Sequence, residues 1–356
     1  MNSAATPPRA APPSAQRAVA AWLIACCALV FAMVVVGGLT RLTESGLSIV
    51  EWQPISGVLP PLGDADWREL FEKYQRTPQY QQVNRDMSLE EFKGIFWLEY
   101  FHRLLGRLVG LAFLLPYLYF LARRRLERGL AWKLAGVFAL GAAQGVLGWL
   151  MVASGLVSEP RVSHLRLTAH LALAFAIYAA MLWIALDLLL GRGAPQARSV
   201  RGRLAAPAWT VTGLVAFMVL TGGLVAGLRA GRAYNTFPLM DGHLVPPEAF
   251  LLEPWWKNFF YNMATVQLDH RLGAYALLAA VAWLWVRALR LDVPRSVRAL
   301  AHLLAAAVLA QAALGVSTLL AGVPIALATL HQAGALVVLT VALVLAHRIA
   351  PPAPGR

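Results

Sequence analysis

The stretch FWLEYFHRLLGRLVG, residues 96–110, is apolar enough to begin a membrane-spanning helix, yet it contains a glutamate, a histidine and two arginines. Ionisable side chains are costly in hydrocarbon, so those that remain there usually face the inside of a helix bundle and serve a function. Glu99, His102, Arg103 and Arg107 are therefore the first candidates for a functional site.

The composition indicates a multi-pass membrane protein. Hydrophobic residues make up 59% of the 356 residues, charged residues make up 14%, and the mean hydropathy is +0.59, well above what a soluble core requires. A helix of about 20 apolar residues crosses the hydrocarbon core of a bilayer. Eight such stretches occur, at residues 19–40, 95–120, 131–155, 166–190, 207–228, 262–286, 299–321 and 325–347. We expect an all-α fold with eight transmembrane helices.

The net charge of +13 does not indicate a nucleic-acid partner, because the basic residues follow the loops. With the N-terminus in the cytoplasm, the cytoplasmic segments contain 17 of the 31 basic residues and two acidic ones; they are residues 1–18, 121–133, 190–206, 287–298 and 348–356. The long loop 41–95 instead contains six basic and nine acidic residues. The positive-inside rule therefore predicts that both termini are cytoplasmic.

The second half of the chain repeats motifs of the first in the same order. The matching pairs are Gly37-Gly38-Leu39 with Gly222-Gly223-Leu224, His102-Arg103-Leu104 with His270-Arg271-Leu272, Ala143-Gln144 with Ala310-Gln311, and Thr168-Ala169-His170 with Thr329-Leu330-His331. The repeat predicts two pseudo-symmetric four-helix bundles, residues 19–190 and 207–347. Residues 191–206 would form a cytoplasmic linker, and residues 1–18 and 348–356 cytoplasmic tails, the first of them disordered.

The first outer loop is the longest and contains a helical pattern. Trp67, Leu70, Phe71 and Tyr74 follow the spacing of one helix face, with Asp66 as a possible N-cap. This helix near 66–74 would lie on the membrane surface or pack as a lid on its own bundle. Ser88 and Glu91 form a capping box that predicts the start of the next span.

Four histidines occupy related positions near the outer ends of the even-numbered spans: His102, His170, His270 and His331. A single histidine in a helix is usually a hydrogen-bonded core residue, but four at repeat-related positions favour a function. Zinc usually takes a compact tetrahedral cluster, whereas heme iron takes one imidazole on each face, supplied by facing helices. We therefore predict two heme-iron sites, His102 with His170 and His270 with His331.

The cysteines exclude covalent heme attachment of the usual kind. Cys26 and Cys27 are adjacent within the first span, and the chain has no Cys-x-x-Cys-His motif. A heme must therefore be held without thioether bonds.

The residues around the histidines are not the same in both halves. Arg103 and Arg271 follow their histidines directly and could pair with heme propionates, or could snorkel toward the interface. Three residues before the histidine, the first half has Glu99 and the second half has Gln267. The acid makes the first half the candidate catalytic site, and a purely structural carboxylate paired with an arginine is the alternative.

Several longer strings resemble the heme A synthase family, in particular its alpha-proteobacterial and mitochondrial branch. They are Gly37 to Ser48, Glu51-Trp52 with Pro54, Glu99 to Arg103, and Asn235 to Gly242, and the resemblance extends from about residue 20 over the rest of the chain. Many bacterial relatives carry a cysteine pair in the first outer loop, which this sequence lacks.

The resemblance implies an enzyme of a bacterial inner membrane that oxidises a methyl group of heme O to the formyl group of heme A for terminal oxidases. It implies that His102, His170 and Glu99 surround the substrate heme in the N-terminal half, and that His270 and His331 hold a heme b in the C-terminal half. Heme O synthase and an electron acceptor such as quinone are the implied partners.

Two other classes of protein remain open at this point. A non-catalytic diheme b-type cytochrome that relays electrons from quinol would contain two equivalent hemes and show no preference for a farnesylated one. A transporter built from repeats would not depend on the four histidines for visible absorption.

Overall fold

The computed structural model describes residues 13–54, 56–190 and 198–350, with side chains from residue 14 and, after the second gap, from residue 202. Eight helices in it are long and apolar enough to cross a membrane. They are α1 (Pro13–Leu42), α4 (Leu89–Ala122), α5 (Arg128–Ser154), α6 (His164–Leu190), α7 (Arg198–Leu228), α9 (Met263–Arg290), α10 (Arg295–Leu320) and α11 (Ile325–Ile349). The predicted all-α, multi-pass membrane fold is confirmed.

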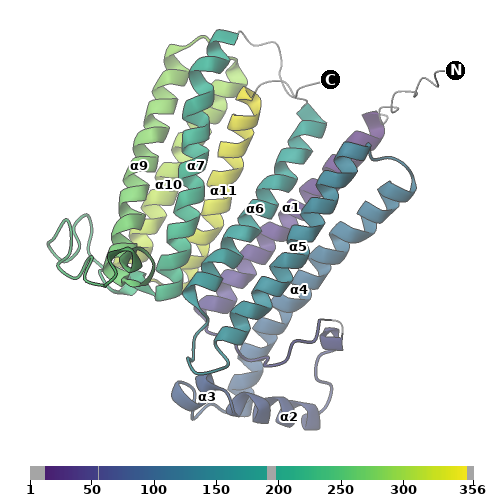
Figure 1. Ribbon diagram of the computed structural model, residues 1–356, viewed down its shortest axis with the longest axis vertical. Coiled ribbons are helices and arrows are strands. Elements are labelled where there is room, and N and C mark those ends of the chain that lie inside the picture. Colours follow the sequence, from purple (N-terminus) through teal and green to yellow (C-terminus); the bar gives the residue numbers. More distant parts are fainter. Residues whose placement is uncertain (1–12, 55, 191–197, 351–356) are drawn as a thin grey trace.

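The eight long helices form two groups of four with the same packing scheme (Figure 1). In the N-terminal group, α1 packs on α4 and α6, and α5 packs on α6 and α4. In the C-terminal group, α7 packs on α9 and α11, and α10 packs on α11 and α9. Helix α6 of the first group contacts α7 and α11 of the second, and α1 contacts α11, so these four helices form the interface between the halves.

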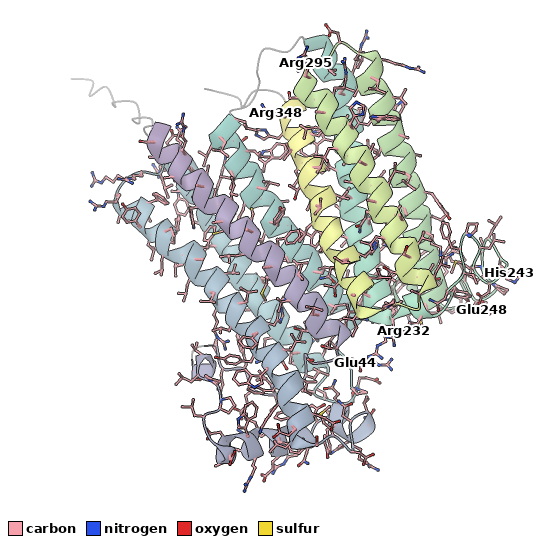
Figure 2. All side chains as sticks on the ribbon, turned by 180° about the vertical axis from the view of Figure 1, so that it is seen from behind. Glu44, Arg232, His243, Glu248, Arg295 and Arg348 are labelled. Carbon is pink, nitrogen blue, oxygen red and sulfur yellow. The ribbon has the colours of Figure 1, made fainter. Side chains whose placement is uncertain are left out.

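The short elements gather at one end of the molecule, which we call the loop end (Figure 1). They are η1 (Ser56–Val58), α2 (Asp64–Gln75), α3 (Pro78–Gln82), η2 (Ala230–Arg232), η3 (Trp255–Lys257) and α8 (Asn258–Tyr261). The start of α1 and the end of α11 lie at the opposite, terminal end, together with Arg295 and Arg348 (Figure 2). Both long loops therefore lie on the same side of the helix bundle.

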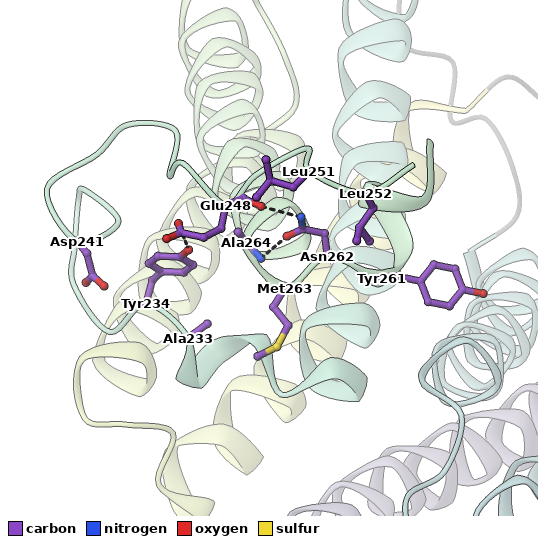
Figure 3. Close-up of a pocket in the computed structure, with 10 residues that line it drawn as sticks. All are labelled: Ala233, Tyr234, Asp241, Glu248, Leu251, Leu252, Tyr261, Asn262, Met263 and Ala264. Carbon is purple, nitrogen blue, oxygen red and sulfur yellow. Dashed lines mark hydrogen bonds between the residues drawn. The ribbon is translucent and has the colours of Figure 1, made fainter. Parts of the chain in front are cut away.

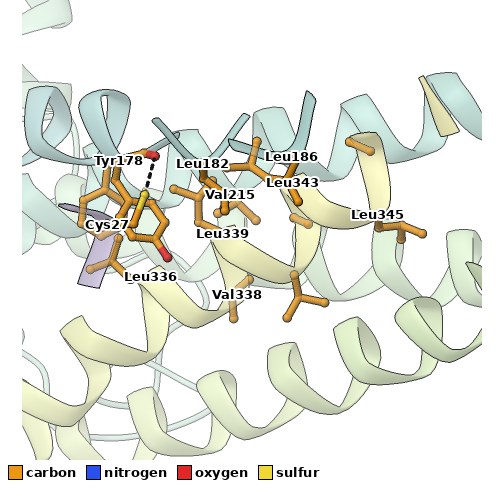
Figure 4. Packing of buried hydrophobic residues seen from close by; sticks show 14 of the residues in the cluster. Cys27, Tyr178, Leu182, Leu186, Val215, Leu336, Val338, Leu339, Leu343 and Leu345 are labelled. Atoms are coloured by element: carbon orange, nitrogen blue, oxygen red, sulfur yellow. Dashed lines mark hydrogen bonds between the residues drawn. The ribbon is translucent and has the colours of Figure 1, made fainter. Parts of the chain in front are cut away.

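The core between the halves is built from aliphatic side chains of α6, α7 and α11 (Figure 4). Leu336 is fully buried and Leu345 is 1% exposed. Burial of this kind contributes about 25 cal/mol per Å² of apolar surface where the alternative is water, and within the bilayer close packing takes over that role. Cys27 lies at the edge of this cluster, and its thiol donates to the Tyr178 carbonyl at 3.8 Å.

A few polar contacts also join the halves. The Tyr178 hydroxyl lies 2.8 Å from the Thr340 hydroxyl, and His347 Nε2 lies 2.8 Å from Asp187 Oδ1 near the terminal end. Gln332 of α11 donates to the Val34 carbonyl of α1 at 2.7 Å. Because polar side chains inside a bilayer are seldom left unpaired, these contacts fix the register between the halves.

Helix α2 is a lid on its own bundle, which is the second of the two arrangements predicted for this segment. Trp67 and Tyr74 are buried against Phe92 and Phe96 at the start of α4, with Trp67 edge-on to Phe96 at 5.0 Å between ring centroids. Asp66 is not the N-cap; it is the third residue of a helix that Gly63 caps, and its carboxylate accepts from the Gly63 amide. The predicted helix therefore exists but begins two residues earlier.

The capping box at the start of α4 is confirmed. The Glu91 amide donates to the Ser88 hydroxyl at 3.3 Å, and the Ser88 amide donates to Glu91 Oε2 at 2.8 Å. This box starts α4 six residues before the predicted span, and the extra turns are the surface on which α2 rests.

The division into domains remains a prediction, with some boundaries now placed. Helix α1 begins at Pro13 within the expected tail 1–18, and α7 begins at Arg198 within the expected linker 191–206. Residues 1–12, 191–197 and 351–356 of the predicted tails and linker lie outside the described residues.

Candidate functional site

Each of the four histidines lies directly against a glycine of a neighbouring helix in its own half. In the N-terminal half, a Cβ added to Gly37 would lie 3.0 Å from His102 Nε2, and one added to Gly148 would lie 2.9 Å from His170 Cε1. In the C-terminal half, a Cβ added to Gly222 would lie 3.2 Å from His270 Cε1, and one added to Gly315 would lie 2.7 Å from His331 Cε1. The imidazoles occupy space that any larger residue at the glycine positions would take.

The glycines follow the internal repeat. Gly37 and Gly222 differ by 185 positions, and Gly148 and Gly315 by 167, as do Gln144 and Gln311. The sequence showed the glycine pairs but not what they face. Only the three-dimensional structure assigns them to the imidazoles.

The second glycine of each pair packs against the other half of the molecule. A Cβ on Gly38 would lie 2.9 Å from the Gln332 amide of α11, and one on Gly223 would lie 3.0 Å from the Thr168 side chain of α6. Each Gly-Gly pair therefore serves two contacts at once, one with a histidine and one between the halves.

The hydrogen bonds of the imidazole-bearing helices also repeat. Gln144 Nε2 donates to the His170 carbonyl at 2.9 Å, and Gln311 Nε2 donates to the His331 carbonyl at 2.8 Å. In α9, His270 Nδ1 lies 2.8 Å from the Thr221 hydroxyl, which leaves Nε2 as the nitrogen available to a ligand.

Two of the four imidazoles have a buried ring nitrogen without a hydrogen-bond partner. The predicted pairing of His102 with His170 and of His270 with His331 stays a prediction. Nδ1 of His170 and of His331 is buried and has no hydrogen-bond partner, so both rings retain unused polar atoms. No group of three or more His, Cys, Asp or Glu side chains suited to a metal ion occurs in the described part of the chain.

Glu99 is buried, 2% exposed, and its two oxygens are held by three different residues. Oε1 accepts from Arg103 Nη2 at 2.7 Å, and Oε2 accepts from the Ser48 hydroxyl at 2.7 Å and from the Ile49 amide at 2.9 Å. The carboxylate thus faces the loop that follows α1, and none of its hydrogen bonds goes to His102. The contacts match the alternative of a carboxylate paired with an arginine, and a catalytic role for Glu99 stays a prediction.

Gln267 holds the equivalent place in the C-terminal half. Its Nε2 donates to the Ala230 carbonyl at 3.0 Å and to the Tyr234 carbonyl at 3.2 Å, and its Oε1 accepts from Arg271 at 3.4 Å. The amide therefore bonds to the same kind of loop as Glu99 does, but without a negative charge.

Arg103 and Arg271 hold equivalent loop segments, which we call the N-terminal strap (residues 49–54) and the C-terminal strap (residues 234–239). Arg103 donates to the carbonyls of Ile49 at 2.7 Å and Glu51 at 3.0 Å. Arg271 donates to the carbonyls of Tyr234 at 3.1 Å and Thr236 at 2.9 Å, which are the same positions displaced by 185. The offset of the glycine pairs therefore continues through both straps.

The far ends of the two straps are also held by arginine. Arg107 donates to the carbonyls of Gln53 at 2.8 Å and Pro54 at 3.0 Å. In the other half Arg271 reaches the equivalent carbonyls of Pro238 at 3.3 Å and Leu239 at 3.2 Å. The role of Arg107 was missed from the sequence, since its repeat partner is Tyr275 and nothing in the local pattern relates it to the strap.

Two cavities lie at the loop end, and neither is lined by any of the four histidines. One of about 280 Å³ lies between the N-terminal strap and α2 and is lined by Arg103, Arg107 and Lys73 among others. The other, about 570 Å³, lies on the loop after α7 (Figure 3). There the Tyr234 hydroxyl donates to Glu248 at 2.7 Å; desolvation and this bond raise the pKa of Tyr234 to about 12, and the bond lowers the pKa of Glu248.

Comparison with known proteins places the chain in a family. Residues 20–343 match the family model described as cytochrome oxidase assembly protein. The heme A synthase of Nitrosospira multiformis is 59% identical over 335 residues, covering 94% of both chains, and that of Nitrosomonas eutropha is 58% identical over 327 residues, covering 91% of this chain and 92% of the relative. The heme A synthase of Parvibaculum lavamentivorans is 51% identical over 333 residues, with 94% of each chain covered. With two histidine–glycine sites in a bundle of eight membrane helices and these relatives along nearly its whole length, the chain belongs to the cytochrome oxidase assembly protein family that includes the heme A synthases.

Proposed function

We propose that the chain is a heme A synthase, which oxidises a methyl group of heme O to the formyl group of heme A. The observation that carries the proposal is the difference between two otherwise equivalent sites. Both have two imidazoles against glycines and an arginine-held strap, but only the N-terminal half has a buried carboxylate, Glu99, where the other has Gln267. A relay between two like hemes does not require this difference.

His102 and His170 would hold the substrate heme, and His270 and His331 would hold a resident heme b. Glycine at positions 37, 148, 222 and 315 leaves the imidazoles room to face the space between the helices. Thr221 and the glutamines Gln144 and Gln311 orient the rings and the helix backbone. A bound heme supplies electron transfer, and the protein supplies binding, orientation and charge.

Conversion of a methyl to a formyl group removes four electrons and four protons and adds one oxygen atom from water. It proceeds by two successive hydroxylations, and the hydrate formed in the second loses water. The electrons pass to an acceptor such as quinone. Glu99, held by Arg103, Ser48 and Ile49, stabilises positive charge on the substrate or takes a proton at Oε2 beside the Ser48 hydroxyl.

Arg103 and Arg271 would support the hemes mainly through the straps. Nearly all their N–H groups donate to strap carbonyls or to Glu99 and Gln267, and of the Arg271 nitrogens only Nε is buried without a partner. Direct pairing with propionates remains a prediction that would require one of these bonds to be exchanged.

The location and partners follow from the same proposal. We expect the bacterial inner membrane, with both termini cytoplasmic and the loop end on the outer side, because Arg295 and Arg348, which belong to two of the basic segments, lie at the terminal end. Heme O synthase would supply the substrate.

The test is to express the chain together with a heme O source and identify the bound hemes by mass. Heme A together with heme b supports the proposal. Two molecules of heme b and no heme A would favour the diheme cytochrome. Replacing His102 or His170 by methionine should abolish heme A while retaining heme b, and replacing His270 or His331 should remove heme b.

A further inference from the structure

The two straps are held alike on one side and differently on the other. Toward α4 and α9, arginines bind the carbonyls of both straps at equivalent positions. On the opposite side, Asn235 of the C-terminal strap donates to the Leu319 carbonyl at the end of α10 at 2.7 Å and to the Gly231 carbonyl at 2.9 Å. The C-terminal strap is therefore hydrogen-bonded to both helices that flank it.

The N-terminal strap has no counterpart of this second bond. The residue equivalent to Asn235 is Val50, which has no side-chain donor, and among the described residues no hydrogen bond joins residues 49–54 to α5. The contact there is a stack of Trp52 on Trp149, with ring centroids 5.6 Å apart and an angle of 11° between the planes. Trp52 is 49% exposed.

This stack joins the N-terminal strap to α5 at the residue next to the one that faces His170. Trp149 directly follows Gly148, the glycine that faces His170. Helix α4 also packs less closely on α5 than α9 does on α10.

We propose that the contact between the N-terminal strap and α5 is the gate through which a porphyrin with an isoprenoid tail enters and leaves, with Trp52 on Trp149 as its closing contact. The inference rests on the proposed function, because a substrate must exchange at every turnover whereas a resident heme need not. Separating two indoles leaves no buried polar group unpaired. Separating Asn235 from Leu319 breaks a hydrogen bond and leaves the Leu319 carbonyl without its partner. The C-terminal half is thus built to stay closed and the N-terminal half to open.

The experiment exchanges the residues at the equivalent positions 50 and 235, so that each strap gains or loses the asparagine side chain. The purified protein, loaded with heme O and heme b, is mixed with excess apomyoglobin, and the loss of each heme is followed by mass. Trp52→Ala should speed heme O loss roughly threefold to tenfold, because the interaction energy of an aromatic pair corresponds to a factor of this size. Val50→Asn should slow heme O loss about fivefold, because the net energy of one hydrogen bond corresponds to a factor of this size. Asn235→Val should speed the loss of heme b by a similar factor.

The controls separate a gate from general damage. Trp52→Phe keeps a stacked ring and should release heme O near the wild-type rate, and heme b loss should be unchanged in every variant of the N-terminal half. Unchanged heme O loss in both Trp52→Ala and Val50→Asn, or an equal change in heme b loss, would overturn the gate.

The gate and the proposed function fail in distinguishable ways. If the wild type forms heme A but the release rates do not respond, the gate alone is wrong. If the wild type binds no heme O, amide hydrogen exchange still tests the gate: Val50→Asn should slow exchange in residues 49–54, and no slowing would refute it.

Discussion

Glu44 and Arg229 occupy equivalent positions in the two halves and form an ion pair with each other at 2.7 Å. They are separated by the same 185 residues as the glycine pairs, and both have a left-handed backbone, with φ of 59° and 58°. If the two halves were identical, a charged residue at this position would meet a residue of the same charge in the other half, and the two would repel each other. Here opposite charges make the halves complementary at the loop end, where Figure 2 shows Glu44.

Charge reversal tests this contact. Glu44→Arg should lower the stability of the detergent-solubilised protein by roughly 0.5–1 kcal/mol, because the side chains are 38% and 28% exposed and such pairs are worth little. The double variant Glu44→Arg with Arg229→Glu should recover most of the loss in thermal unfolding. If the double variant is less stable than either single one, the pair does not join the halves.

Glu99→Gln gives the N-terminal site the residue type of the C-terminal one. Because Gln267 beside Arg271 shows that an amide fits such a place, we expect a folded protein that binds heme O but forms heme A at least about a hundredfold more slowly, the usual range for losing a proton-transfer or charge-stabilising group. Heme A is measured by mass. Normal product formation with heme bound would remove Glu99 from the mechanism.

The glycines that face the histidines should not tolerate a methyl group. Gly315→Ala would bring a Cβ to 2.7 Å from His331, and Gly148→Ala would bring one to 2.9 Å from His170, so each ring must move at a cost of about 1–3 kcal/mol. We expect loss of the low-spin heme spectrum of the affected half only. Gly145→Ala, with no atom within 4 Å of the added Cβ, is the matched control and should retain both spectra.

The contact between Tyr234 and Glu248 should make the loop after α7 sensitive to pH at both extremes. The pKa of Tyr234 is raised from 10.0 to about 12, so its stabilisation is complete below pH 10 and is lost as the pH rises toward 12. The pKa of Glu248 is lowered from 4.5, so its stabilisation is present above pH 4.5 and is lost as the pH falls through the lowered value.

Thermal unfolding of the wild type and of Tyr234→Phe over a range of pH measures this contribution. The difference in melting temperature should be largest between pH 5 and 10 and should shrink on the acid side. A difference that is constant down to well below pH 4.5 would contradict the assignment.

The sequence by itself determined the eight spans, the repeat and the positions of the four histidines within it. Apolar length, the positive charge of the loops and helix capping are local properties, so they can be read along the chain. The same local pattern placed the lid helix, although Asp66 was assigned to the wrong position in it.

Only the tertiary structure decided what these residues contact. It turned Glu99 toward Ser48 and Ile49, set the glycines against the imidazoles, and assigned Arg103, Arg107 and Arg271 to the straps. These contacts join residues 16 to 65 positions apart in the chain, from Gly315 with His331 to Gly37 with His102, and they depend on how helices and loops pack across space. Spacing along a single helix shows which residues share a face, but not which partner that face will meet.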